Sequence, residues 1–146
     1  MNFSTKGEYG LRAAVSLAKS YPVKKTIKEI SIEEKISVKY LERLAGDLRR
    51  GGIVKSVKGK NGGYVLAESP AKIKVGKIIE SVEGPILVKC FGARCKLFAS
   101  RTGTTNAGHT NEKMIAHQCP SSFVWMKLGE QIKKTLYGIR LSDLIK

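Results

Sequence analysis

Residues 54–66 read VKSVKGKNGGYVL, two short apolar runs on either side of a basic, glycine-rich tip. The Asn-Gly-Gly at 61–63 accepts positive φ angles, so the tip can turn tightly and the two runs can pair as a β-hairpin. Lys55, Lys58 and Lys60 surround this tip. Folding a hairpin does not require three unpaired lysines, whereas binding along a phosphate backbone does favour them.

Two helices are predicted upstream of the hairpin from their capping signals. Residues 5–8 (Thr-Lys-Gly-Glu) have the spacing of a capping box and predict a first helix that ends near Ser20. A second box at residues 26–29 (Thr-Ile-Lys-Glu) predicts a short helix that ends near Glu34.

A third helix is predicted from Ser37, a favourable N-cap, to about Arg50, where two glycines end it. Two short helices joined by a tight turn are typical of a helix-turn-helix. The basic hairpin follows at the position of a wing. The sequence therefore predicts an α+β, mostly helical fold, with a winged helix-turn-helix DNA-binding domain over residues 1–84.

The remainder of the chain is predicted to form two further segments. Amphipathic spacing predicts a helix over residues 73–83. Residues 85–119 lack periodicity and carry all three cysteines, which suggests a sensor loop. Residues 120–146 begin with Pro120, for which Cys119 would be the N-cap, and contain a long helix ending at Gly138, followed by a short tail.

The long C-terminal helix has a wide apolar face, in which Val124, Leu128, Ile132 and Leu136 recur every four residues. A second copy of the same helix is the simplest partner for this face. Packing back onto the first helix of the same chain is the alternative.

The net charge of the 146-residue chain is +15, and it is concentrated in the N-terminal half. Residues 1–78 hold 17 Lys and Arg against 7 Asp and Glu. Such an excess favours a polyanionic partner, here double-stranded DNA. No apolar stretch approaches the roughly 20 residues that span a bilayer, and no signal peptide is evident. A cytoplasmic protein without a membrane partner is expected.

The candidate DNA-binding residues fall into two groups. The start of the third helix would enter the major groove, where Ser37, Val38, Lys39, Glu42 and Arg43 could contact base edges. The candidates for phosphate or minor-groove contact are Lys28, Arg49, Arg50, Lys55, Lys58, Gly59 and Lys60. The alternative for Ser37 is that it is only an N-cap. The alternative for Glu42 is that it is only a solvated surface charge.

The chain resembles the IscR/NsrR family of bacterial winged-helix regulators, the Rrf2 superfamily. The resemblance rests on residues 3–13, 36–44, 48–54 and 56–64, of which the Gly-Gly-Tyr of the wing is the most specific. It implies a homodimeric transcription factor, usually a repressor, that binds a near-palindromic operator. The chain departs from the family where Lys35 replaces a frequent Gly and Lys58 replaces a frequent Arg. Arginine fits a minor groove better than lysine does.

The cysteines suggest a metal or redox site. Cys90 and Cys95 are separated by four residues, and Cys119 follows after a further 23. Thiolates suit both iron–sulfur clusters and zinc, and the neighbouring Arg94 and Lys96 would stabilise them. Zinc held with one histidine, or a reversible disulfide between Cys90 and Cys95, remain open alternatives.

The family resemblance implies an iron–sulfur cluster, [2Fe-2S] or [4Fe-4S], held by the three cysteines and a variable fourth ligand. Ser122 stands where IscR-like members have a histidine. An acidic residue from the partner subunit completes the site in NsrR-like members, and Glu8 occupies the matching position. Our hypothesis is that Glu8 of the partner subunit is the fourth ligand. The alternatives are a capping-box role for Glu8, and His109 or His117 as ligand.

Other classes of function fit the sequence less well. A regulator of the same fold could respond through a partner protein without any cluster. An enzyme is not expected, because no nucleophile–base pair, Cys-x-x-Cys or phosphate-binding glycine motif is present, and no catalytic residue is predicted. A nucleoid protein that binds by charge alone would show a salt dependence without operator preference.

Overall fold

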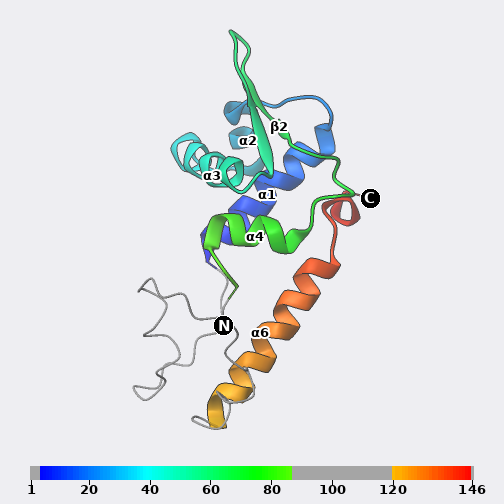
Figure 1. The fold of residues 1–146 in the computed structure, drawn as a ribbon. Coiled ribbons are helices and arrows are strands. Elements are labelled where there is room, and N and C mark those ends of the chain that lie inside the picture. Colours follow the sequence, from blue (N-terminus) through cyan, green and yellow to red (C-terminus); the bar gives the residue numbers. More distant parts are fainter. Residues whose placement is uncertain (1–3, 87–119, 146) are drawn as a thin grey trace, which may run out of the picture. The chain divides into compact units, whose positions relative to one another are not determined.

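The computed structural model describes residues 4–86 and 120–145 (Figure 1). The elements are α1 (Thr5–Ser20), α2 (Ile27–Glu34), α3 (Val38–Arg50), β1 (Val54–Val57), β2 (Gly63–Leu66), α4 (Val75–Glu83), α6 (Pro120–Gly138) and a 3₁₀ turn, η2 (Leu141–Leu144). The strands form one two-stranded sheet. The predicted mostly helical α+β class is therefore confirmed.

The chain divides into two compact units. One unit comprises residues 1–86 together with 133–146, and the other comprises residues 87–132. The first unit contains the helix-turn-helix, the wing, α4 and the end of α6. In the part of the chain that the structure describes, no helix is both long and apolar enough to cross a membrane.

The start of α1 is capped differently from the prediction. Ser4 is the N-cap, and its hydroxyl accepts from the Lys6 N–H at 3.1 Å. A carboxylate from α4 completes this cap: Glu83 Oε1 accepts from the Gly7 N–H at 2.8 Å and from the Ser4 hydroxyl. The expected capping box between Thr5 and Glu8 is thus wrong, and Glu8 is exposed.

The helix-turn-helix agrees with the sequence prediction at both caps. Thr26 and Glu29 form a reciprocal capping box, and the Ser37 side chain accepts from the Tyr40 N–H at 3.3 Å. The turn between α2 and α3 contains Lys35 at φ 54° and ψ 42°, which is left-handed. This conformation explains why glycine is favourable at that position in the related pattern.

The core of the first unit lies between α1, α2, α3, α4 and the base of the wing. Its buried members are Ala13, Ala14, Leu17, Ala18, Ile30, Ile36, Leu41, Leu44, Leu48, Ile53, Val54, Leu66, Ile73, Ile78, Val82 and Leu141. Burying each of the larger aliphatic side chains contributes about 1.5–3 kcal/mol relative to leaving it exposed. Helix α3 and the wing therefore pack on one shared core.

The wing is an antiparallel hairpin in which Val54 pairs with Leu66 and Val57 with Gly63. In the wing, the positive φ angle occurs at Gly59 (129°). Residues 61–63, which were expected to adopt positive φ angles, do not adopt them. Gly63 is instead required for close approach, since a Cβ there would lie 2.5 Å from the Lys25 carbonyl oxygen.

The α1–α2 loop pairs with the wing as an additional edge. The Lys25 N–H donates to the Tyr64 carbonyl at 2.9 Å, and the Tyr64 N–H donates to the Lys25 carbonyl at 2.8 Å. This pairing ties the second strand of the wing to the body of the domain.

The C-terminal segment differs from the expected short tail. The Val75 N–H donates to the Ile139 carbonyl at 3.0 Å, and the Leu141 N–H donates to the Ile73 carbonyl at 2.9 Å. Leu141 is completely buried. These contacts also explain why α4 begins at Val75 rather than at residue 73, because the preceding backbone is extended and pairs with the C-terminal segment.

Candidate nucleic-acid interface

Helix α3 presents one polar face to solvent and buries the other. Leu41, Leu44 and Leu48 are each 1% exposed. The predicted base-contacting residues Ser37, Val38, Lys39, Glu42 and Arg43 are all exposed. Ser37 is an N-cap, as the alternative interpretation held, but its hydroxyl hydrogen can still be donated to a base or a phosphate.

Helix α3 is held in place by the first turns of α1. The rings of Tyr9 and Tyr40 meet edge to face with centroids 5.9 Å apart. The Lys6 ammonium pairs with the nearly buried Asp47 carboxylate at 2.9 Å. Arg50 also binds Asp47, so part of the arginine charge is neutralised, whereas Arg49 is exposed and no described carboxylate pairs with it.

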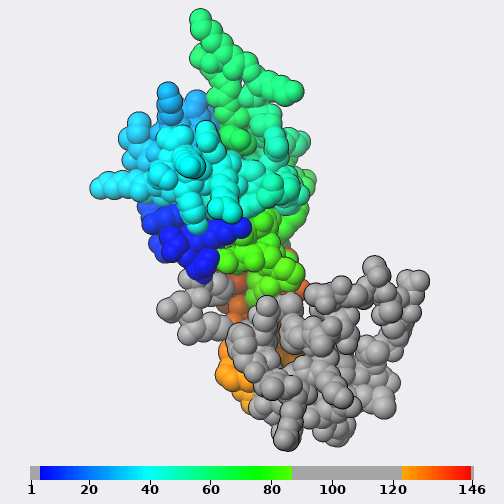
Figure 2. Space-filling model, turned by 90° about the vertical axis from the view of Figure 1, so that its left-hand side faces the viewer, coloured from blue at the N-terminus to red at the C-terminus, as the bar shows by residue number. Residues whose placement is uncertain are grey.

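The wing carries the other predicted cations. Lys55, Lys58, Gly59 and Lys60 are exposed, and among the described residues no carboxylate forms an ion pair with these three lysines. Figure 2 shows the hairpin projecting from the helical body, which leaves its tip accessible. Lys28, at the start of α2, is also exposed.

Two further lysines, Lys24 and Lys25, lie beside the wing and are not among the predicted DNA-binding residues. The Lys24 ammonium donates to the Asn61 carbonyl at the wing tip. Lys25 is instead committed to Glu33, at 2.6 Å, and to the Ser16 hydroxyl. Hydrogen bonds from Lys25 and Ser16 lower the pKa of the Glu33 carboxyl. Lys24 therefore adds a cation at the wing, and Lys25 does not.

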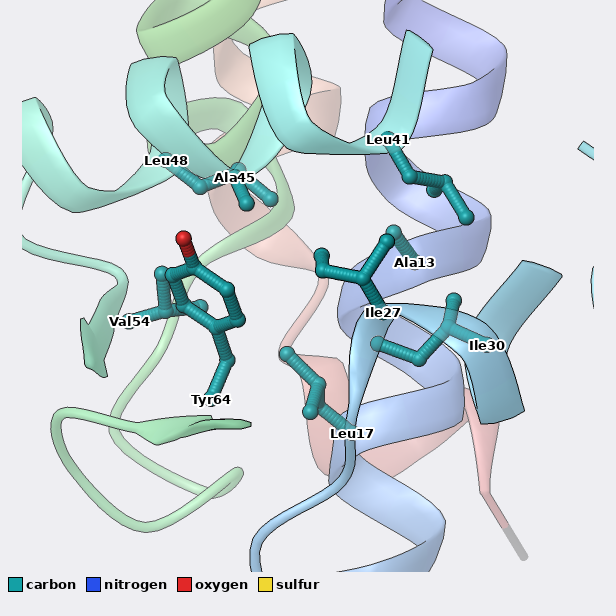
Figure 3. Close-up of a pocket in the computed structure, with 9 residues that line it drawn as sticks. All are labelled: Ala13, Leu17, Ile27, Ile30, Leu41, Ala45, Leu48, Val54 and Tyr64. Atoms are coloured by element: carbon teal, nitrogen blue, oxygen red, sulfur yellow. The ribbon is translucent and has the colours of Figure 1, made fainter. Parts of the chain in front are cut away.

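The base of the wing is closed by apolar packing. Figure 3 shows the Tyr64 ring beside Val54, with its hydroxyl end toward Ala45 and Leu48 and with Ile27 on the opposite side of the space. The cavity enclosed there measures about 10 Å³, close to the space that one water molecule requires. It is too small for a metabolite, so its packing anchors the wing and does not form a ligand pocket.

The predicted metal ligands are only partly within the described residues. Cys90, Cys95 and Cys119 lie outside them, as do His109 and His117. Over residues 4–86 and 120–145, no group of three or more His, Cys, Asp or Glu side chains could hold a metal ion. Glu8 is exposed on α1 and takes no part in the cap, which leaves its carboxylate available.

Replacing the wing lysines tests the interface directly. Lys58→Ala and Lys60→Ala should each weaken binding to every duplex and reduce the slope of log K against log salt by about 0.9, the value for one lost phosphate contact. Lys72→Ala removes an exposed charge at the turn before α4 and should leave the slope unchanged. Unchanged slopes in both wing variants would exclude Lys58 and Lys60 from the DNA contact.

A recognition helix, an N-terminal helix that supports it and a basic hairpin on one core define a winged helix-turn-helix protein of the DNA-binding class. A family model described as "Rrf2: Iron-dependent Transcriptional regulator" matches residues 3–146. The chain belongs to the Rrf2 family of transcriptional regulators.

Individual relatives agree with this assignment. The chain is 35% identical over 149 residues to the regulator IscR of Cereibacter sphaeroides, covering 100% of this chain and 88% of IscR. It is 46% identical over 87 residues to CymR of Bacillus subtilis, covering 59% of this chain and 63% of CymR. The structure of CymR, the global cysteine regulator of B. subtilis, matches with a TM-score of 0.71 at 30% identity, covering 99% of this chain and 96% of CymR. These relatives are transcriptional regulators and not enzymes.

Proposed function

We propose that the chain is a homodimeric transcriptional repressor that binds a near-palindromic operator. Each α3 enters a major groove, and each wing lies along the adjacent backbone or minor groove. The observation that carries this proposal is that the polar face of α3 and the unpaired lysines of the wing are exposed on one shared core.

The three segments expected from the sequence take distinct roles in this proposal. Residues 1–84 bind DNA, residues 85–119 sense a signal, and the helix within residues 120–146 joins two subunits, while the segment after it docks on the DNA-binding unit. The described part of α6 supports the role of joining two subunits. Large apolar side chains along it are exposed, among them Phe123 (51%), Val124 (58%) and Trp125 (40%). Such a surface favours burial against a second copy.

We further propose that an iron–sulfur cluster held by Cys90, Cys95 and Cys119 controls operator binding. The donor set fits, because three thiolates in a basic segment suit an anionic cluster, and the exposed Glu8 of the partner subunit offers a fourth ligand. A bound cluster, [2Fe-2S] or [4Fe-4S], supplies chemistry that responds to oxidants or iron supply. Glu8 lies on α1, the helix whose first turns support α3.

A second candidate function is a regulator of the same fold without a cluster. It would respond through a partner protein, zinc or a thiol switch. The observation in its favour is the 46% identity to CymR across 87 residues, higher than the identity to IscR, although over a shorter span.

The two candidates are separated by purifying the protein without oxygen and measuring visible absorbance, iron and sulfide. Genomic DNA fragments are then selected with the protein as isolated and after iron is removed. We expect a coloured protein that enriches one near-palindromic sequence in a manner that depends on iron. A colourless, iron-free dimer with the same operator preference would remove the cluster from the proposal and favour the second candidate.

The Glu8→Ala variant tests the fourth ligand. It should lose visible absorbance faster than the wild type, because one ligand to the cluster is removed. The urea midpoint of the iron-free protein should be unchanged, since Glu8 does not cap α1. Glu68→Ala changes the charge equally at another exposed position and is the matched control. Equal decay rates in the two variants would clear Glu8 of the ligand role.

A further inference from the structure

Lys35 is in a conformation that a lysine rarely adopts. Among the described residues it is the one non-glycine with positive φ (54°). The turn around it is fixed by Ser31, whose carbonyl accepts from the Lys35 and Ile36 N–H groups and whose hydroxyl donates to the Ile36 carbonyl at 2.6 Å. The backbone therefore favours glycine at this position, yet the chain carries a long cationic side chain.

Lys35 lines an open groove between the start of α1 and the start of α3. Thr5, Tyr9, Ile36, Ser37 and Tyr40 line the same groove. Figure 2 shows the dark blue start of α1 directly beside the cyan helices of the helix-turn-helix. Ser37 belongs both to this groove and to the predicted DNA-reading face, so the groove adjoins that face.

The charge of Lys35 is not neutralised by its neighbours. Lys35 is exposed, and no ion pair joins it to a described carboxylate. The adjacent Glu34 is committed to Arg12, whose Nε lies 2.9 Å from Glu34 Oε2 and whose guanidinium also donates to the Glu34 carbonyl. The groove therefore carries a lysine without an ion-pair partner among the described residues, next to residues that bear hydroxyl groups, and both kinds of group suit a phosphodiester.

We propose that Lys35 contacts a DNA phosphate that lies in this groove, next to the bases read by α3. The contact adds to the predicted set of DNA-binding residues and deepens the proposed function, on which it rests. The free-energy cost of the left-handed backbone at Lys35 is then offset by the added phosphate contact. Since a phosphate contact carries no sequence information, it strengthens binding to operator and random DNA alike.

The test uses the full-length protein, a random-sequence duplex and the selected operator. For Lys35→Gly we expect a higher thermal midpoint, because glycine adopts positive φ without strain, together with weaker DNA binding. The slope of log K against log salt should decrease by about 0.9 on both duplexes. Lys35→Arg should retain the slope, and Lys72→Ala, an equal loss of charge at another exposed lysine, should leave it unchanged.

The salt slope decides the outcome. An unchanged slope in Lys35→Gly, or an equal decrease in Lys72→Ala, would overturn the proposal while leaving operator recognition intact. If the wild-type protein shows no operator preference but the slope still decreases in Lys35→Gly alone, the phosphate contact stands and the proposed function fails. The two conclusions are thereby tested separately.

Discussion

Leu141→Ala should lower the free energy of unfolding by about 3 kcal/mol, within the 2–5 kcal/mol range for a buried leucine. The side chain is completely buried, and its backbone is held by a hydrogen bond to Ile73. Truncation leaves a cavity that the paired backbone segments cannot close by moving together. Urea unfolding followed by circular dichroism measures the change.

Leu144→Ala is the matched control for this prediction. It makes the same substitution in the same 3₁₀ turn, but Leu144 is 42% exposed. Its cost should stay below about 1 kcal/mol, because little apolar surface leaves the core. If the two variants lose equal stability, the C-terminal segment is not docked into the domain as described.

Elements with local signals were predictable from the sequence. Thr26 and Ser37 each cap their helix through the backbone N–H three residues further on, so the neighbouring sequence contains the whole motif. The start of α6 at Pro120 and its end at Gly138 follow the same logic. The buried face of α3 follows from helical periodicity alone.

Elements that depend on distant contacts were not predictable in this way. The carboxylate that serves the start of α1 belongs to Glu83, 79 residues after Ser4. The docking of residues 139–145 depends on pairing with the segment before α4, and the sequence of this short segment carries no sign of that pairing. At the wing tip, glycines occupy several positions, and only the structure distinguishes positive φ at Gly59 from close approach at Gly63.

The candidate interface was predictable to the extent that it follows from helix periodicity and charge. All twelve predicted DNA-binding residues are exposed. Lys24 was missed because its place beside the wing depends on the pairing of Lys25 with Tyr64 across the fold. Lys35 was not among the predicted DNA-binding residues, because its left-handed backbone is visible only in the structure. The family resemblance shows only that glycine is frequent at this position.

The double variant Val124→Glu, Leu128→Glu should dissociate the proposed dimer and weaken operator binding at least about 100-fold. The two side chains lie one turn apart on α6 and are 58% and 37% exposed, so they can form one face against a second copy. Charges introduced there would be buried without partners in the dimer. Operator affinity collapses because two tethered half-site contacts contribute about 10²–10⁴-fold over a single one.

Lys134→Glu is the control for this variant, since it changes the net charge by the same two units on the polar side of α6. It should remain dimeric and retain operator preference. Sedimentation measures the oligomeric state, and titrations with operator and random duplexes measure the affinities. Because the substituted residues are exposed in the single chain, urea unfolding of the DNA-binding domain should be unaffected in both variants. A double-glutamate variant that is still a dimer with wild-type operator affinity would show that this face of α6 does not join the subunits.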